Sequence, residues 1–241
     1  MNRRPLTIKI ITLFPQFINS FAAGFGIIKR AVKLRLLRLA PVDLRAFGLG
    51  SRQTVDGRPY GGGVGMVLRA DVLARAVRFA RTPAAKGQRS RVVLLTPQGK
   101  PFTQSEAERL AKYDRLILVC GRYEGFDERA RALADEELSL GDYILMGGEL
   151  PALVVSEAVM RLRPGVLGKD ESAAQESFSA GLLEYPQYTK PEVLAIKGQK
   201  PKAKSFRVPK VLLSGNHQKI EQWRQNEARK RTKKRRPDLI V

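Results

Sequence analysis

Two apolar runs in the middle of the chain constrain its fold more than any other feature. The first is RVVLLT at 91–96 and the second is RLILVC at 115–120, and each has the length and composition of a buried strand. Each run is followed by a turn that contains glycine, PQGKP at 97–101 and GRYEG at 121–125, and then by a segment with a helical pattern. This repeated order predicts an α/β fold with a mostly parallel sheet that is covered by helices on both faces.

The flanking segments extend this pattern. Residues 6–13 are rich in Ile, Thr and Leu and predict a strand. Residues 27–40 carry apolar side chains three and four positions apart, which predicts an amphipathic helix, and residues 126–135 predict a charged helix. Five glycines fall within nine residues of the segment 52–66, which is too many for a regular element and predicts a loop.

Glycine-containing loops follow three predicted strand ends, at 94–101, 120–128 and 138–151. Ligands of open α/β sheets bind outside the carboxyl ends of the strands, and glycine lets the backbone approach a ligand closely, so these loops predict a small-molecule pocket. The alternative is that the glycines only form turns. None of the loops matches the dinucleotide or phosphate-loop patterns, which disfavours an ordinary dinucleotide site or a nucleoside triphosphatase.

The charge of the chain indicates a polyanionic partner. There are 44 Lys and Arg against 23 Asp and Glu, a net charge of +21, and a hydrophobic content of 43% is enough to build a core. The segment 190–236 alone holds 16 Lys and Arg and three Glu, a net charge of +13. We therefore expect a domain at 1–167, a flexible linker at 168–177 and a small, mainly helical, basic nucleic-acid-binding domain at 178–241.

Several classes of protein are excluded. Cys120 is the only cysteine, so a disulfide within the chain and a cysteine-rich zinc site are impossible. His217 is the only histidine, which makes a Ser-His-Asp enzyme very improbable. No apolar run reaches the length of a membrane span, and the N-terminus has no secretory pattern, so we expect a cytoplasmic protein without a membrane partner. Acid–base chemistry would fall on carboxylates, namely Glu124, Asp127, Asp142, Glu149, Asp170, Glu171, Glu176 and Glu184.

The motifs, taken together, resemble one family. The segments LILVCGRYEGFDER (116–129), SLGDYILMGGELPAL (139–153) and ESFSAGLLEYPQYTKPEV (176–193) carry the likeness, together with TVDGRPYGGGVGM (54–66) and RTKKRRPDL (231–239). In order and spacing the chain is similar, almost from end to end, to the bacterial tRNA (guanine-N1)-methyltransferases, members of the SPOUT superfamily of knotted methyltransferases.

This resemblance implies transfer of a methyl group from S-adenosylmethionine to N1 of the guanosine at position 37 of tRNA. It also implies a deep trefoil knot and a homodimer with the active site at the interface. The family's cofactor-binding positions correspond here to Leu95, Thr96, Pro97, Gly99, Gly121, Tyr123, Glu124, Ser139, Leu140, Gly141, Tyr143, Leu145, Gly147 and Gly148.

The resemblance also implies catalytic and substrate-binding residues. The family's general base is an Asp before Ser-Phe, and this sequence departs from that pattern because Glu176 stands there. Arg161 corresponds to the arginine that stabilises charge on guanine O6. Asp56 and Gly65 correspond to residues that hold the anticodon bases, and Glu184 is another substrate-binding position. Glu124 and Glu184 correspond to acids linked to a Mg²⁺ requirement.

Two alternatives remain open at this stage. One is a non-enzymatic RNA-binding or ribosome-associated protein in which the glycine loops are only turns. The other is a SPOUT methyltransferase that acts on ribosomal RNA.

Overall fold

The chain forms two compact units, Met1–Asp170 and Glu171–Val241, in a computed structural model. The structure describes residues 5–24, 26–82, 87–167, 176–178, 181–194 and 207–240. The boundary between the units falls inside the predicted linker, of which residues 168–175 lie outside the described residues. The precise limits of the predicted domains stay a prediction.

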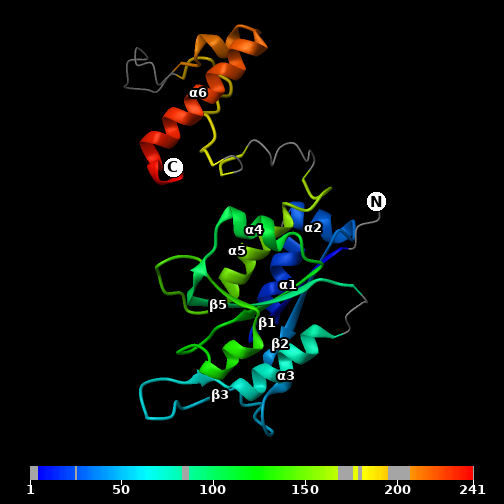
Figure 1. Ribbon diagram of the computed structural model, residues 1–241. Coiled ribbons are helices and arrows are strands. Elements are labelled where there is room, and N and C mark those ends of the chain that lie inside the picture. The colour runs from blue at the N-terminus through cyan, green and yellow to red at the C-terminus, as the bar shows by residue number, and fades with distance from the viewer. Residues whose placement is uncertain are drawn as a thin grey trace. The chain divides into compact units, whose positions relative to one another are not determined.

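The first unit is built on a sheet of five strands in the order β2-β1-β6-β5-β7 (Figure 1). All four neighbouring pairs are parallel, which confirms the predicted α/β class with a mostly parallel sheet. The strands are β1 (Leu6–Thr12), β2 (Leu37–Asp43), β5 (Ser90–Pro101), β6 (Arg115–Cys120) and β7 (Glu136–Ser139). Because neighbouring strands run in the same direction, their carboxyl ends meet at one edge of the sheet.

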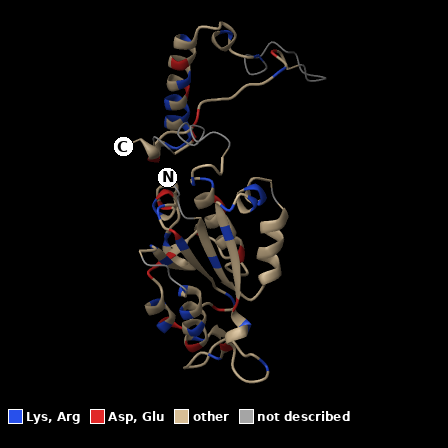
Figure 2. Cartoon of the chain, turned by 90° about the vertical axis from the view of Figure 1, so that its right-hand side faces the viewer, with Lys and Arg blue, Asp and Glu red and all other residues tan. Residues whose placement is uncertain are grey.

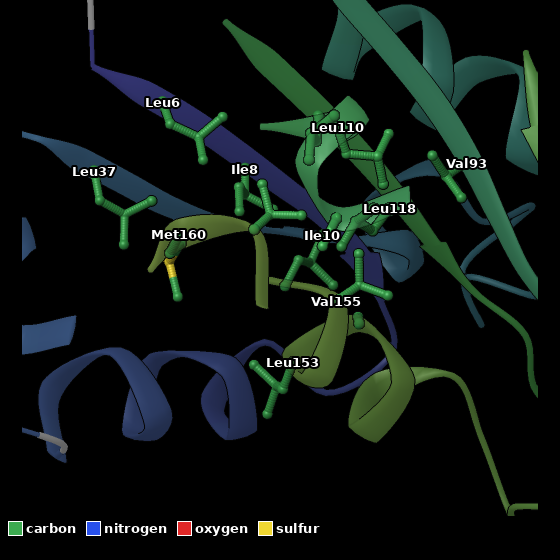
Figure 3. Packing of buried hydrophobic residues seen from close by; sticks show 14 of the residues in the cluster. Leu6, Ile8, Ile10, Leu37, Val93, Leu110, Leu118, Leu153, Val155 and Met160 are labelled. Carbon is green, nitrogen blue, oxygen red and sulfur yellow. The ribbon is translucent and has the colours of Figure 1, made fainter. Parts of the chain in front are cut away.

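Strand β6 lies at the centre and is buried on both faces. Leu116 and Leu118 belong to one apolar cluster, which Figure 3 shows, whereas Ile117 and Val119 belong to a second cluster on the opposite face. Each fully buried side chain of this kind stabilises the fold by about 1.5–3 kcal/mol. The continuous apolar run RLILVC is therefore a strand whose two faces pack against different apolar clusters.

Helices supply those two layers. The first cluster includes residues of α1 (Pro15–Gly24), α2 (Gly26–Lys33), α4 (Gln104–Leu110) and α5 (Glu149–Met160). The second includes residues of α3 (Ala70–Arg81) and of the 3₁₀-helices η1 (Leu44–Phe47) and η2 (Glu128–Leu133).

The helix predicted over 27–40 is wrong in its second half, because the chain leaves α2 and enters β2 at Leu37. Arg35 has a φ of 56°, a left-handed conformation that ends a helix. The amides of Arg35 and Leu36 donate to the carbonyls of Val32 and Ala31, both at 3.0 Å. Pro41 is unsuited to a helix interior but is tolerated in β2, which is an edge strand.

The chain around β7 also differs from the prediction. The charged helix expected at 126–135 is the short η2, which Asp127 caps by accepting a hydrogen bond from the Arg129 amide at 3.0 Å. The Asp135 carboxylate then accepts from the Val92 amide at 2.7 Å, which brings β7 alongside β5. The sequence predicts a strand end before the loop at 138–151, but not the extent of this strand. The turn expected at 97–101 is instead an irregular part of β5.

The predicted glycine-rich loop at 52–66 is mostly irregular, and its beginning forms a short strand. That strand, β3 (Asp56–Gly57), pairs antiparallel with β4 (Val67–Leu68). The amide of Leu68 donates to the Gly125 carbonyl at 2.9 Å, so the base of the loop is attached to the segment that follows β6.

The second unit contains one long basic helix, α6 (His217–Arg235), flanked by η5 (Lys210–Leu213) and η6 (Pro237–Leu239). His217 is the first residue of α6, and the preceding Asn216 caps it by accepting from the Lys219 amide at 3.0 Å. The buried hydroxyl of Thr232 accepts from the Leu183 amide at 2.8 Å, so an extended segment packs along the helix. Figure 2 shows Lys and Arg on much of the helix that ends near the C-terminus.

Charged side chains cover the outer strand β7. The side chain of Glu136 is 8% exposed and accepts a hydrogen bond from Arg91 Nε at 2.9 Å and another from Arg109. Lys100 joins the network through Glu106 at 2.8 Å and Glu136 at 3.4 Å. Burial by itself would raise the pKa of Glu136, but the hydrogen bonds from Arg91 and Arg109 outweigh it, and the pKa lies below the ordinary 4.5.

This pKa shift predicts a pH-dependent stability. A carboxyl whose pKa is lowered by folding stabilises the protein fully above its unfolded pKa, and the contribution is lost as the pH falls through the folded pKa. Glu136→Gln should therefore lower the free energy of unfolding by about 2 kcal/mol near neutral pH. The difference in the free energy of unfolding between this variant and the wild-type protein should shrink below about pH 4.5.

Urea unfolding between pH 3 and pH 7 measures this effect. Glu157→Gln, at an exposed position of α5, is the control and should change stability little at any pH. Equal pH dependence in the Glu136 variant and the original protein would contradict the prediction.

Candidate active site

A cavity of about 400 Å³ lies at the carboxyl ends of β5, β6 and β7. Its lining comes mainly from the three glycine-containing loops that the sequence singles out, at 94–101, 120–128 and 138–151. The volume is within the range of pockets that hold small molecules. The parallel sheet thus brings together three segments that are distant in sequence.

Thirteen of the fourteen predicted cofactor-binding residues line this cavity. They are Leu95, Thr96, Pro97, Gly121, Tyr123, Glu124, Ser139, Leu140, Gly141, Tyr143, Leu145, Gly147 and Gly148. Gly99 does not line it, because it lies in the irregular part of β5 against β7. A Cβ atom at Gly99 would be 2.5 Å from the Leu138 nitrogen, so its glycine is explained by packing between strands.

The second and third loops are in backbone contact. The amide of Gly148 donates to the Gly121 carbonyl at 2.8 Å. A Cβ atom at Gly148 would be 2.6 Å from Cys120 Cα, a distance that no real side chain tolerates. Gly148 is therefore required for the two loops to meet at one wall of the cavity.

Cys120, beside this contact, is part of the core. Burial raises the pKa of its thiol well above the ordinary 9.0, and the negative charge of Glu149 raises it further. The thiol stays protonated at neutral pH and is unsuited to act as a nucleophile.

Sequence reasoning missed several polar residues of the cavity wall. Arg131 donates to the carboxylate of Glu137 and to the amide oxygen of Gln98, and pairs with Glu128 at 2.7 Å. Hydrogen bonds from Arg131 to Glu128 and Glu137 raise the pKa of the arginine, so it stays charged. The sequence around Arg131 gave no signal of this, because Glu137 and Gln98 lie 6 and 33 positions away along the chain.

Glu124 joins the cavity to the glycine-rich loop. Its amide donates to the Met66 carbonyl at 2.9 Å. Gly65 has a φ of +85°, a conformation that favours glycine, and a Cβ atom there would be 2.4 Å from Glu124 Oε1. Asp56 lies opposite Leu68 in the small sheet. The structure thus connects the predicted substrate-binding residues Asp56 and Gly65 with the second pocket loop.

The predicted catalytic residues lie in both units. Arg161 is half-buried and ends α5 in the first unit. Glu176 and Glu184 belong to the second unit. There the amide of Glu184 donates to Ser177 Oγ at 3.0 Å, which holds the segments that carry the two acids together.

The predicted metal site at Glu124 and Glu184 stays a prediction. Glu124 and Glu184 belong to different units, and no group of three or more His, Cys, Asp or Glu among the described residues could hold a metal ion. Among the described helices, none is both long and apolar enough to cross a membrane.

The chain matches a known protein family over almost its whole length. The family model tRNA (Guanine-1)-methyltransferase TrmD matches residues 6–241. A tRNA (guanine-N(1)-)-methyltransferase of Thermus thermophilus is 50% identical over 232 residues, which cover 96% of this chain and 90% of the relative. A protein of the same name from Symbiobacterium thermophilum is 48% identical over 236 residues, covering 98% and 92%.

A third relative, from Shewanella sediminis, has the same name and is 49% identical over 232 residues, covering 96% and 91%. Likeness of this extent does not favour a non-enzymatic RNA-binding protein. The matched region spans both units and contains every loop of the cavity. The chain belongs to the tRNA (guanine-1)-methyltransferase family, a family of the SPOUT class.

Proposed function

We propose that this protein is an enzyme that transfers a methyl group from S-adenosylmethionine to N1 of the guanosine at position 37 of tRNA. The observation that carries the proposal is that three glycine-containing loops converge on one cavity. The chain that forms it shares about half its residues with proteins named tRNA (guanine-N(1)-)-methyltransferase.

The cavity suits S-adenosylmethionine, which supplies an electrophilic methyl group on a sulfonium. Gly121 and Gly148 line the cavity, and the hydrogen bond between them fixes the backbone of its wall. Leu95, Leu140 and Leu145 offer apolar surface for an adenine ring. The polar wall around Arg131 offers partners for the charged amino-acid end of the cofactor.

The reaction needs a base. Guanine N1 carries a proton, which must leave as the N1–C bond forms and the C–S bond breaks, so that the sulfonium becomes a neutral thioether. We propose that the carboxylate of Glu176 accepts this proton and that Arg161 stabilises negative charge on guanine O6. Two carboxylates near the cavity are unsuited to the role, because Glu149 is paired with Arg122 and Glu137 with Arg131.

We also propose that the protein is a homodimer with its active site at the interface. Several large apolar side chains are exposed beside the cavity, among them Ile144 at 80% and Met146 at 92%. Leu150 and Val154, four positions apart on one face of α5, are exposed as well. Burial of this surface against a second copy would remove it from water.

The remaining features follow from the family. We propose that the loops of the cavity form a deep trefoil knot, that 168–177 joins the two domains and that the protein works in the cytoplasm. We further propose that 178–241 is a small, mainly helical, basic domain that binds tRNA, which the exposed cations of α6 support. A Mg²⁺ requirement stays a prediction, and no step above depends on the metal.

The function is tested with the full-length protein in two stages. Calorimetry should detect binding of S-adenosylmethionine, and mapping of the methyl product on unmodified tRNA transcripts should place it on N1 of guanosine 37. Transcripts with adenosine at position 37 serve as the control and should stay unmethylated. Absence of cofactor binding would refute the proposal that the protein is a methyltransferase. Methylation of ribosomal RNA but not of tRNA would show that the substrate is ribosomal RNA.

Glu176→Gln tests the assignment of the base. The variant keeps the size of the side chain but cannot accept the proton, so single-turnover methylation should slow by about 10²- to 10⁴-fold. Affinity for S-adenosylmethionine should not change. Near-normal turnover would move the role of the base to Asp170 or Glu171.

The basic helix α6 is tested by the dependence of tRNA binding on salt. Deleting residues 229–236 would remove buried Thr232. We therefore change three exposed residues, Lys233, Lys234 and Arg235, together to Gln. If they contact phosphates, the slope of log affinity against log salt should become shallower by about 2. The same change at exposed Lys29, Arg30 and Lys33 of α2 is the matched control, and an equal effect there would contradict a special role of α6.

A further inference from the structure

Glu149, the first residue of α5, is an acid of the cavity region that the proposed reaction does not use. It is 3% exposed and does not line the cavity. Both of its carboxylate oxygens have partners: Oε1 accepts from Thr12 Oγ1 at 2.8 Å, and Oε2 accepts from Arg122 Nε at 3.0 Å. A second guanidinium nitrogen of Arg122 lies 2.9 Å from Oε2. A buried carboxylate bound in this way holds its partner in one orientation.

Arg122 itself lines the cavity and extends the contact to the third loop. Its Nη1 donates to the Met146 carbonyl at 3.1 Å. Its guanidinium carbon lies 4.4 Å from the centre of the Phe14 ring, just beyond β1. Arg122 and Glu149 thus connect the end of β1, the second loop, the third loop and the start of α5.

The packing around this ion pair leaves no room for a side chain at Gly147. A Cβ atom at Gly147 would be 2.3 Å from Arg122 Nε and 2.7 Å from Glu149 Oε2. Glycine at this position is therefore explained by the ion pair beneath the third loop. Directly beside it, the Gly148 amide makes the hydrogen bond to Gly121 that joins the two loops.

We propose that Glu149 is a positioning residue for the active site, and that Thr12 assists it. The carboxylate fixes Arg122, and Arg122 fixes the second and third loops relative to each other at the wall of the cavity. The consequence for S-adenosylmethionine rests on the function proposed above, because those loops would enclose the cofactor. Thr12 is included although it lies in β1, outside all three loops.

Hydrogen exchange tests this positioning role in the free protein. In Glu149→Gln the Gly148 amide, whose acceptor is in the opposite loop, should exchange at least tenfold faster, while the amide of Leu118 in β6 should change much less. Glu136→Gln is the matched control, since it breaks a buried ion pair whose arginines do not line the cavity. Glu136→Gln should leave the exchange rate of the Gly148 amide unchanged relative to that of the Leu118 amide.

Cofactor affinity is the second readout. Glu149→Gln should weaken binding of S-adenosylmethionine by about 10- to 100-fold, because small displacements of binding groups have effects of this size. Turnover at saturating cofactor should fall by a smaller factor. Since Glu149 acts through Arg122, the double variant Arg122→Met, Glu149→Gln should bind the cofactor no more weakly than Arg122→Met alone.

Thr12→Val keeps the proposal testable if Glu149→Gln fails to fold. It keeps the shape but removes two hydrogen bonds, the one that Thr12 Oγ1 donates to Glu149 and the one that it accepts from the Phe14 amide at 2.9 Å, and affinity should fall about threefold. Unchanged exchange at Gly148 in both variants, or equal effects in Glu136→Gln, would overturn the proposal. If the original protein binds no S-adenosylmethionine, the proposed function fails, and the exchange experiment still decides the role of Glu149.

Discussion

The burial of β6 on both faces is the constraint on which the rest of the first unit depends. A strand without a solvent-facing side must be covered by two layers of helices, and the connections to those helices must leave from the ends of the strands. The carboxyl ends of β5, β6 and β7 therefore release three loops at one edge of the sheet. The cavity is a direct result of this arrangement, and the chemistry of the site is concentrated in loops that a rigid core supports.

Local patterns were sufficient to predict the centre of the sheet and the cavity. The run RLILVC has the signature of a buried strand, and the glycines that follow it mark close backbone contact. Local patterns failed where distant residues decide the structure. Residues 34–40 have helical spacing, but Arg35 turns the chain and pairing with β1 makes the rest a strand. Strand β7 has no long apolar run, and Arg91 and Arg109, 45 and 27 positions away along the chain, neutralise its Glu136.

The same limit applies to the site. The pocket glycines could be assigned because the family motifs contain them, and thirteen of the fourteen named residues lie in one cavity. The partners of Glu149 could not be assigned, since Thr12 is 137 positions away and Arg122 is 27 positions away. Glu149 is one of the acids that the sequence offers for acid–base chemistry, but its burial and its pairing with Thr12 and Arg122 make it unsuited to act as the base. Only the three-dimensional structure makes this distinction, because the spacing of these residues in the sequence does not indicate which of them are buried.

The two edges of the sheet have a consequence for the behaviour of the protein at high concentration. An edge strand exposes unpaired backbone groups, to which a strand of another molecule can add. In β2, the edge on one side, Pro41 has no amide hydrogen to offer. On the other side, the acids of β7 are enclosed by Arg91, Arg109 and Arg131, so a strand that approached would have to displace charged side chains. Both edges thus discourage aggregation through sheet extension.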